Sequence, residues 1–338
     1  MIQSKKIKSL DKSQLHPPGT VEAQYRQLEE DLKFYWDKQS DYLDFNRVEK
    51  VSCSLCDEPP PEGACVVFLK YRFPYLCCPS CSLIYPSPRP KIQFINEQYK
   101  SGRFASTFKE IYLPSAPYRM KTIFRERVED IILQRVPSGK LLDIGCGSGH
   151  FLKVAANCGF EVYGVEPQPQ MAAFAETELG LKNIHSGSFE GLEFPGVHFD
   201  VITLWDVLEH VPSPHSVLQN VFKRLRPGGW VFAYTENVES FNVFIAKEDS
   251  EIFAPDVHLR HYSPKTFRME FEKAGFKVRE VMTRGLDIQH IETTVKVKKG
   301  KYPEPELQWM FEMSNELQEV INVCGRGDNL RLFAQKER

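Results

Sequence analysis

A glycine-rich turn directly after a short apolar run limits the fold of this chain more than any other feature. The run is residues 141–144, and the turn reads Gly145-Cys146-Gly147-Ser148-Gly149 before residues of helical periodicity. Alternate glycines allow a tight turn between a strand and a helix, and they let a ligand approach the main chain closely. A helix that begins there presents unpaired N–H groups to that ligand. We therefore expect a nucleotide-binding turn in an α/β fold.

Short β-like runs alternate with helical stretches from residue 140 onwards, a pattern typical of βαβ units and a parallel sheet. The expected strands are residues 140–144, 161–165, 199–204, 230–235, 277–283 and 330–335. The expected helices are residues 148–157, 170–179, 215–225 and 264–274, the last of them with Ser263 as its N-cap. Pro227-Gly228-Gly229 predicts a hard stop before the strand at 230–235.

The spacing of the glycines distinguishes between nucleotide ligands. A dinucleotide fingerprint requires glycine at position 150, where this chain has His150, and no lysine of the Walker type follows the turn. Asp143, two residues before the first glycine, suits a ligand that carries an ammonium group. The next expected strand leads to Glu166, whose carboxylate can accept hydrogen bonds from both hydroxyls of a ribose.

This region resembles the class I S-adenosylmethionine-dependent methyltransferases. Four motifs occur in the family's order between about 138 and 237: D-I-G-C-G-S-G, G-V-E, F-D-V-I-T-L-W-D-V-L-E-H and L-R-P-G-G. The resemblance implies a Rossmann-like seven-stranded sheet with an antiparallel last strand, and S-adenosylmethionine as the cofactor. It assigns the methionine part to Asp143 and the glycines, the ribose to Glu166 and the adenine to 187–189. The full set of implied cofactor contacts is Asp143, Gly145, Cys146, Gly147, Gly149, Glu166, Ser188, Phe189, Trp205 and Asp206.

The catalytic groups are less visible, because methyl transfer mainly requires alignment of the two reactants. Asp206, Glu209 and His210 lie at helical spacing after the expected fourth strand, near the edge where such folds bind ligands. His210 can act as a general base, or it can simply pack the turn. The trio can also form a divalent metal site, since it is similar to the E-x-x-E-H segment of ubiquinone-type O-methyltransferases.

A second candidate stretch is D-V-H-L-R-H-Y-S-P at 256–264, which places His261 and Tyr262 just before a helix. It resembles the H-L-x-H-[FY]-[ST]-P segment of bacterial methyltransferases that act on sugars, lipids and small metabolites. That resemblance implies a position near the substrate entrance. The alternative is a loop whose histidines cap the following helix.

Two C-x-x-C pairs, 21 residues apart, lie ahead of the expected sheet. Cys53, Cys56, Cys78 and Cys81 have the spacing of a zinc ribbon, and four thiolates can close a tetrahedron around Zn²⁺. Cys77 is an alternative ligand to Cys78, but only Cys78 leaves the two-residue gap before Cys81. A closed site of this kind is structural. The stretch C-x-x-C-S-L-I-Y-P-S-P from Cys78 resembles the N-terminal zinc-binding segment of some bacterial sugar methyltransferases.

The sequence thus divides into five expected parts: an N-terminal helical extension (1–48), a cysteine module (49–91), a helical cap (92–136), the cofactor-binding core (137–238) and a lid with the last strands (239–338). The net charge of −2 gives no general field for nucleic acid or anionic membrane. The first 14 residues lack the apolar region of a secretory signal, and no stretch suits a membrane span, so we expect a cytoplasmic protein.

The expected function is S-adenosylmethionine-dependent methyl transfer to a small molecule or a glycan or lipid precursor. The acceptor would be aligned by residues 206–210 and 258–262. One alternative is an RNA base methyltransferase that uses the cysteine module to bind RNA. Leu204-Trp205-Asp206-Val207 stands where enzymes for exocyclic amines usually carry N-P-P-[YF], which argues against those acceptors. The other alternative is a non-catalytic scaffold that binds the cofactor.

Overall fold

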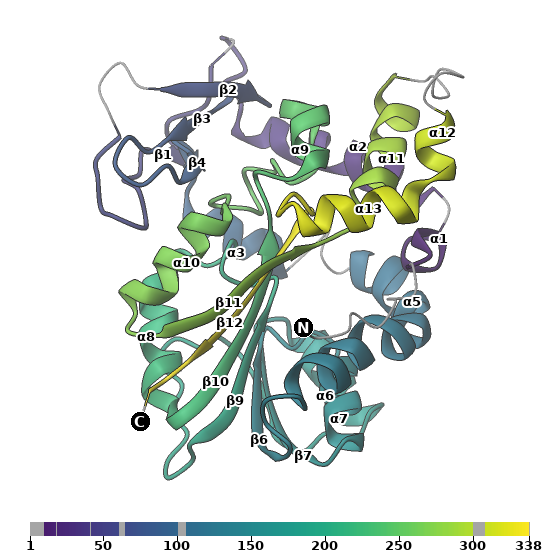
Figure 1. Cartoon of the computed structure of the whole chain (residues 1–338). Helices are drawn as coiled ribbons and strands as arrows, with labels where there is room; N and C mark the ends of the chain where they lie inside the picture. The colour runs from purple at the N-terminus through teal and green to yellow at the C-terminus, as the bar shows by residue number, and fades with distance from the viewer. Residues whose placement is uncertain are drawn as a thin grey trace.

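A seven-stranded mixed sheet forms the centre of the molecule (Figure 1). The structure is a computed structural model that describes residues 10–17, 19–40, 42–60, 65–100, 106–299 and 308–337. Residues 1–9 of the expected N-terminal extension and 305–307 of the lid lie outside these ranges. The strand order is β11-β12-β10-β9-β6-β7-β8.

The sheet confirms the expected Rossmann-like α/β fold. Strands β6 to β10 pair in parallel, whereas β12 runs antiparallel to both β10 and β11. Every residue of β9 is buried, which explains its mainly apolar sequence. The strand bounds are β6 Gly139–Ile144, β7 Phe160–Glu166, β8 Ile184–Ser186, β9 Phe199–Trp205, β10 Leu225–Glu236, β11 Lys277–Arg284 and β12 Asn329–Gln335.

The expected hard stop at 227–229 is wrong. These residues lie inside β10, where the pairing with β9 shifts register between Leu225 and Trp230. Gly228 takes a φ of 82°, and a Cβ on Gly229 would come within 2.9 Å of the Arg226 carbonyl oxygen. The proline and glycines therefore form an irregularity within the strand and do not end it.

Helices cover both faces of the sheet. One face packs against α6 (His150–Asn157), α7 (Pro169–Thr177) and the end of the helical cap, and the other against α8 (Pro214–Arg224) and α10 (Pro264–Lys273) (Figure 1). The predicted N-cap of α10 is confirmed. Ser263 Oγ accepts from the Thr266 N–H at 3.2 Å, and Thr266 Oγ1 accepts from the Ser263 N–H at 2.8 Å.

The helical cap is continuous through its prolines. It comprises η2 (Phe108–Tyr112), α5 (Leu113–Arg119), η3 (Met120–Phe124) and η4 (Glu126–Ile132). Pro114 and Pro117 lie within α5, between wider π-type turns. Proline donates no N–H, and such wide turns are often found at functional sites. The first helix of the expected cap is α3 (Ile92–Lys100).

The cysteine module contains two small sheets and shares its core with the rest of the protein. Strand β1 (Val48–Glu49) pairs with β5 (Arg89–Pro90), and β3 (Phe73–Cys77) lies between β2 (Val66–Lys70) and β4 (Ile84–Pro86). One apolar cluster contains Leu55 and Leu83 of the module together with Phe267 of α10. A second cluster joins Phe73 and Tyr75 to the N-terminal helices and to Phe253. The predicted part boundaries therefore do not separate independent cores.

The remaining helices gather at the same end of the sheet as the cysteine module (Figure 1). They are α1 (Lys12–Leu15), α2 (Thr20–Leu32), η1 (Lys33–Tyr35), α9 (Phe241–Ala246), η5 (Lys247–Asp249), α11 (Asp287–Lys299), α12 (Gln308–Glu312) and α13 (Ser314–Val323). Within the described ranges, no helix combines the length and the apolar character that crossing a membrane requires.

We expect Leu83→Ala to destabilise the whole protein by about 2–5 kcal/mol, because Leu83 is fully buried in the shared core. Leu69→Ala is the matched control, since Leu69 belongs to the same module but is 64% exposed, and it should stay within about 0.5 kcal/mol of the parent. Urea unfolding followed by circular dichroism measures both. A separate early transition confined to the module would contradict the shared core.

Candidate cofactor and catalytic site

The glycine turn requires its glycines. Gly145, Gly147 and Gly149 have φ values of 72°, 54° and 77°, in the left-handed region that other residues avoid. A Cβ on Gly149 would lie 2.7 Å from Leu181 and 2.8 Å from Ala175, so the spacing also lets α6 pack closely. The N–H groups of Gly145 and Cys146 both donate to the Val165 carbonyl, at 2.8 and 3.1 Å. The turn is thereby fixed at the carboxyl end of β6.

Glu166, the last residue of β7, holds this turn from the neighbouring strand. Its two carboxylate oxygens accept from the N–H groups of Gly147 at 2.8 Å and Gln168 at 2.9 Å. Burial raises the pKa of Glu166, and the two backbone hydrogen bonds act against that rise. Each oxygen keeps a second lone pair, so the carboxylate can still accept from a ligand hydroxyl.

Asp143 lies deeper than expected. It is 2% exposed, and Oδ1 accepts from the Thr203 hydroxyl at 2.6 Å. Burial raises its pKa to about 7, although the Thr203 hydrogen bond and the charge of Arg127 favour the ionised form. The carboxylate thus bridges β6 and β9 beneath the turn. This placement favours support of the turn over direct contact with a ligand's ammonium group.

Three other predicted cofactor contacts have buried side chains. Phe189 packs in the sheet core, Cys146 is 7% exposed, and Trp205 lies edge-on to Tyr234 with ring centroids 4.5 Å apart. Side-chain contact with a ligand is therefore not favoured for Phe189 and Cys146, whose main chains can still line the site. The indole ring of Trp205 is packed, but its Nε1 has no hydrogen-bond partner among the described residues. Ser188 Oγ accepts from the Glu190 N–H at 3.2 Å, which shapes the turn after β8.

The helical cap supplies two arginines that the sequence did not reveal. Arg127 is 9% exposed, and its guanidinium carbon lies 4.6 Å from the ring centroids of both Trp205 and Tyr234. Among the described residues, Arg127 Nε, Trp205 Nε1 and the Tyr234 hydroxyl are buried without a hydrogen-bond partner. Arg119 is held by Ser115 Oγ, 2.8 Å from its Nε. These donors suit an anionic group.

Asp206 follows β9 in an unusual backbone conformation. Its φ is 57°, its N–H donates to the Tyr234 carbonyl at 3.1 Å, and its side chain is exposed. Non-glycine residues in this region cluster at functional sites. Its charge acts on both Arg119 and Arg127, so it faces the same part of the site as the two arginines.

A group of two glutamates and two histidines lies beyond Asp206; Glu209 is buried and the other three side chains are half-buried. His210 Nδ1 lies 2.9 Å from the Val257 carbonyl, and its Nε2 lies 3.9 Å from Glu209 Oε1. The rings of His210 and His258 are 4.9 Å apart, and His258 Nδ1 lies 3.0 Å from Glu236 Oε2. Helical spacing in sequence predicted the first pair, whereas the fold brings in His258 and Glu236.

Burial and neighbouring charges shift the pKa values of these residues in different directions. Burial, with the nearby His258 charge, lowers the pKa of His210 to about 3. Burial also acts to lower the pKa of His258, but Glu236 outweighs it and the value rises to about 9. Burial and Asp206 raise the pKa of Glu209 to about 8. Near neutral pH the group thus holds a neutral His210 beside a charged His258.

The divalent metal alternative for Asp206, Glu209 and His210 is not supported. Asp206 is exposed, whereas Glu209 is 2% exposed. Across the described ranges, the four module cysteines are the single set of at least three such side chains whose ligand atoms come together.

His261 and Tyr262 occupy different environments from each other. His261 is 3% exposed between Tyr75 and Phe253, and both ring nitrogens are buried with no hydrogen-bond partner among the described residues. Burial lowers its pKa well below the ordinary value. Tyr262 is fully buried in the sheet core, and its hydroxyl donates to Glu270 at 3.2 Å. This placement favours a structural role for Tyr262 over contact with an acceptor.

The four predicted metal ligands come together as expected. The Sγ atoms of Cys53 and Cys81 are 3.5 Å apart, those of Cys56 and Cys78 3.4 Å, and those of Cys56 and Cys81 3.7 Å. A tetrahedral site with Zn–S bonds of about 2.3 Å has edges of about 3.8 Å. Cys77 stays outside the set, with its thiol directed to the Cys78 carbonyl.

Both C-x-x-C pairs form the same hydrogen-bonded turn. The Asp57 N–H donates to the Cys53 carbonyl, and the Ser82 N–H donates to the Cys78 carbonyl, each at 2.9 Å. Asp57 and Ser82 have φ values of 60° and 72°. The thiols are therefore held in place by the backbone, and the residues present fit a tetrahedral cation.

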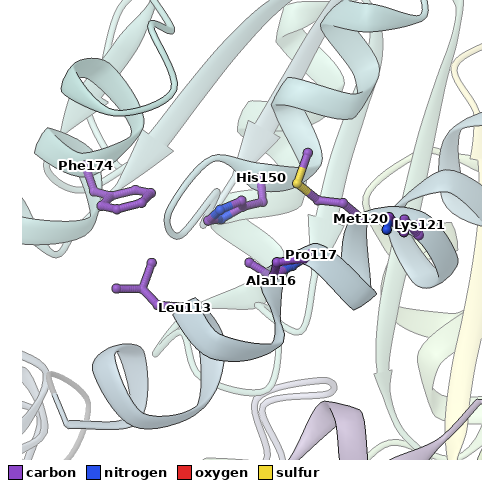
Figure 2. Close-up of a pocket in the computed structure, with 7 residues that line it drawn as sticks. All are labelled: Leu113, Ala116, Pro117, Met120, Lys121, His150 and Phe174. Carbon is purple, nitrogen blue, oxygen red and sulfur yellow. The ribbon is translucent and has the colours of Figure 1, made fainter.

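A mostly apolar cavity of about 440 Å³ lies next to the glycine turn. His150, the first residue of α6, reaches it from that turn, and Figure 2 shows α5 and α7 side chains around the same space. None of its lining residues was a predicted site residue. They are Leu113, Ala116, Pro117, Met120, Lys121, His150 and Phe174.

Comparisons with known proteins agree with this geometry. Residues 118–281 match a family model described as a methyltransferase domain. A Thermotoga maritima S-adenosylmethionine-dependent methyltransferase has a TM-score of 0.50 and 19% identity, over 72% of this chain and 100% of that one. A Haloferax volcanii methyltransferase complexed with the Trm112 activator also has a TM-score of 0.50, with 17% identity over 72% and 98%. These two similarities show the fold.

Residues 118–281 form a class I S-adenosylmethionine-dependent methyltransferase domain. Similar curated proteins include the ubiquinone biosynthesis O-methyltransferases of Thiobacillus denitrificans, 32% identical over 33% of this chain and 50% of that protein, and Shewanella sp., 29% identical over 42% and 63%. The chain thus spans about half to two thirds of the length of these relatives. The cysteine module lies outside the match to the methyltransferase domain.

We expect the purified protein to carry one tightly bound Zn²⁺ per chain, and Cys53→Ser to lose it, because a hydroxyl cannot replace a thiolate in a closed four-sulfur site. Cys65→Ser is the control, since Cys65 is exposed and outside the cluster. Elemental analysis by mass spectrometry counts the metal. Equal zinc in both variants, or none in the parent, would refute the assignment.

The His258–Glu236 pair should give a measurable pH dependence. A folded pKa of about 9 against about 6.5 in the unfolded chain means that the pair's stabilisation is complete below pH 6.5 and is lost as pH rises through 9. Glu236→Gln should lower the pKa of His258 by about 1–3 pH units and remove that decline. Histidine NMR titration, with urea unfolding at pH 6.5 and 9, measures both. A parent His258 that titrates at or below pH 6.5 would contradict this.

Proposed function

We propose that this protein transfers the methyl group of S-adenosylmethionine to a hydroxyl group of a small molecule or of a glycan or lipid precursor. One observation carries the proposal: the glycine turn held by Glu166 and the neutral His210 both lie at the carboxyl edge of the sheet. Glu166 ends β7, and the His210 turn follows β9. Parallel α/β sheets bind their ligands at this edge.

The cofactor supplies an electrophilic methyl group on a sulfonium. The Glu166 carboxylate would hold its ribose hydroxyls. The unpartnered donors of Arg127, Trp205 and Tyr234 suit its carboxylate, and the exposed Asp206 suits its ammonium group. Asp143 supports the turn from below, through Thr203.

His210 is the proposed general base. The Val257 carbonyl accepts from Nδ1–H, so the lone pair is on Nε2. The lowered pKa of His210 keeps the ring neutral, so Nε2 can accept the proton of the acceptor hydroxyl. The acceptor oxygen would then attack the methyl carbon in line with the departing sulfur. The ring nitrogens of His261, which have no hydrogen-bond partner among the described residues, would be able to bond a polar group of the acceptor.

The relatives' name supports a hydroxyl acceptor, since they are O-methyltransferases of ubiquinone biosynthesis. We also propose Zn²⁺ as a structural ion in the module, because four buried or half-buried thiols fit its tetrahedron. A thiolate site of this kind requires reducing surroundings, which supports a cytoplasmic location.

The test uses S-adenosylmethionine with a tritiated methyl group and three acceptors: catechol, a nucleotide-linked glucose and a ribosomal RNA fragment. We expect label on one of the first two and not on the RNA. His210→Asn should lower kcat by about 10²–10⁴-fold, with cofactor affinity unchanged, because only the proton acceptor is removed. Labelling of the RNA alone would overturn the small-molecule proposal.

The matched control is His198→Asn. His198 is exposed and directly precedes β9, at the opposite end of that strand from His210. It should leave kcat within about twofold of the parent. Equal losses in the two variants would show that His210 acts only through stability.

A further inference from the structure

The first cysteine turn, residues 53–57, is linked through Arg260 to the segment that carries His210. Ser54 lies between Cys53 and Leu55, and its Oγ accepts from Arg260 Nε at 3.0 Å. The two residues are 206 positions apart in sequence. A zinc-type turn and the catalytic segment are thus joined through one guanidinium group.

Arg260 is the largest fully buried side chain of the described residues, at 1% exposure. Its Nη1 donates to the carbonyls of Leu208 and Val211, both at 2.6 Å, and its Nη2 donates to the Pro212 carbonyl at 3.1 Å. Burying a guanidinium is costly unless its donors are satisfied. Here the carbonyls of a single irregular turn satisfy it, and Ser54 completes the set.

That turn has little regular structure of its own. The N–H of Leu259 donates to the Glu209 carbonyl at 2.8 Å, and His210 Nδ1 bonds the Val257 carbonyl. Residues 208–212 are therefore held mainly by the main chain of residues 257–259 and by the guanidinium group of Arg260. Arginine presents its donors in a rigid plane, so a small displacement of the guanidinium moves several carbonyls at once.

The first cysteine turn is also fastened at a second point. Lys273 of α10 donates to the Leu55 carbonyl at 2.8 Å and lies 3.4 Å from Asp57 Oδ2. The serine of the second cysteine turn, Ser80, takes the place that Leu55 has in the first turn; it is exposed and donates to Glu58 within the module. The first cysteine turn is thus the one tied to the catalytic segment.

We propose that Arg260 is a positioning residue that couples the metal-bound first cysteine turn to residues 208–212, so that the module sets the position of His210. The inference rests on the proposed function in taking His210 as the base. The module then supports residues 208–212 through Arg260, in addition to contributing apolar side chains to the shared core. The charge of Arg260 also contributes to the lowered pKa of His210, after burial and His258.

Ser54→Ala tests the coupling with the smallest change. It removes the hydroxyl that accepts from Arg260 and leaves all four cysteines. We expect full zinc content, amide hydrogen exchange at 208–212 faster by about 10- to 100-fold, and altered ¹⁵N shifts of the His210 ring. With an active acceptor, kcat should fall by about tenfold while KM for S-adenosylmethionine stays constant.

Ser80→Ala is the matched control, since it makes the same change in the second cysteine turn. It should leave zinc, exchange at 208–212 and the His210 shifts as in the parent. If Ser54→Ala behaves like Ser80→Ala in exchange and in the His210 shifts, the coupling is overturned. A Ser54→Ala protein that has lost its zinc also overturns it, because the serine would then act on the metal site.

Arg260 variants give a second measurement. Arg260→Lys keeps the positive charge but loses the planar set of guanidinium donors. Amide hydrogen exchange at 208–212 should therefore become faster, while the pKa of His210 changes little. Arg260→Gln should also raise the His210 pKa, a readout that a purely structural role would not move. These readouts need no acceptor. A protein that shows them but methylates none of the acceptors would therefore refute the proposed function and leave the coupling in place.

Discussion

The hydrogen bonds that fix the glycine turn against β7 are the interaction on which the rest of the site depends. The Val165 carbonyl accepts from Gly145 and Cys146, and the Glu166 carboxylate accepts from Gly147. Left-handed backbone at alternate positions makes these bonds possible, and a side chain on Gly149 would collide with its neighbours. The turn, the start of α6 and the end of β7 therefore form one rigid unit, which other elements surround.

The surrounding elements share cores with the sheet instead of forming separate bodies. The cysteine module contributes to the same apolar cluster as α8 and α10, and a second cluster ties Tyr75 to Phe253. A four-sulfur site in such a position stabilises more than its own short strands. The same reasoning explains why a fully buried Arg260 is tolerated: its charge is met by carbonyl groups that two regions of the chain bring together.

The sequence predicted those features that depend on local pattern. Apolar alternation located six strands of the sheet, and the cysteine spacing identified the four converging thiols. The strand β8 was not located, because three partly exposed residues at a sheet edge carry no periodic signal. Arg127 was missed, because tertiary packing decides which charged side chains of the cap are brought to the site. The pairing of His258 with Glu236 likewise joins segments that only the fold brings together.

The central claim is that the glycine turn and Glu166 bind a sulfonium nucleoside. A crystal structure of the protein as purified, with native mass spectrometry of the same sample, tests it most directly. The account predicts S-adenosylmethionine or S-adenosylhomocysteine at the carboxyl edge of the sheet, with its ribose hydroxyls on Glu166. A pyridine dinucleotide or a nucleoside triphosphate in that place, with no affinity for S-adenosylmethionine, would contradict it.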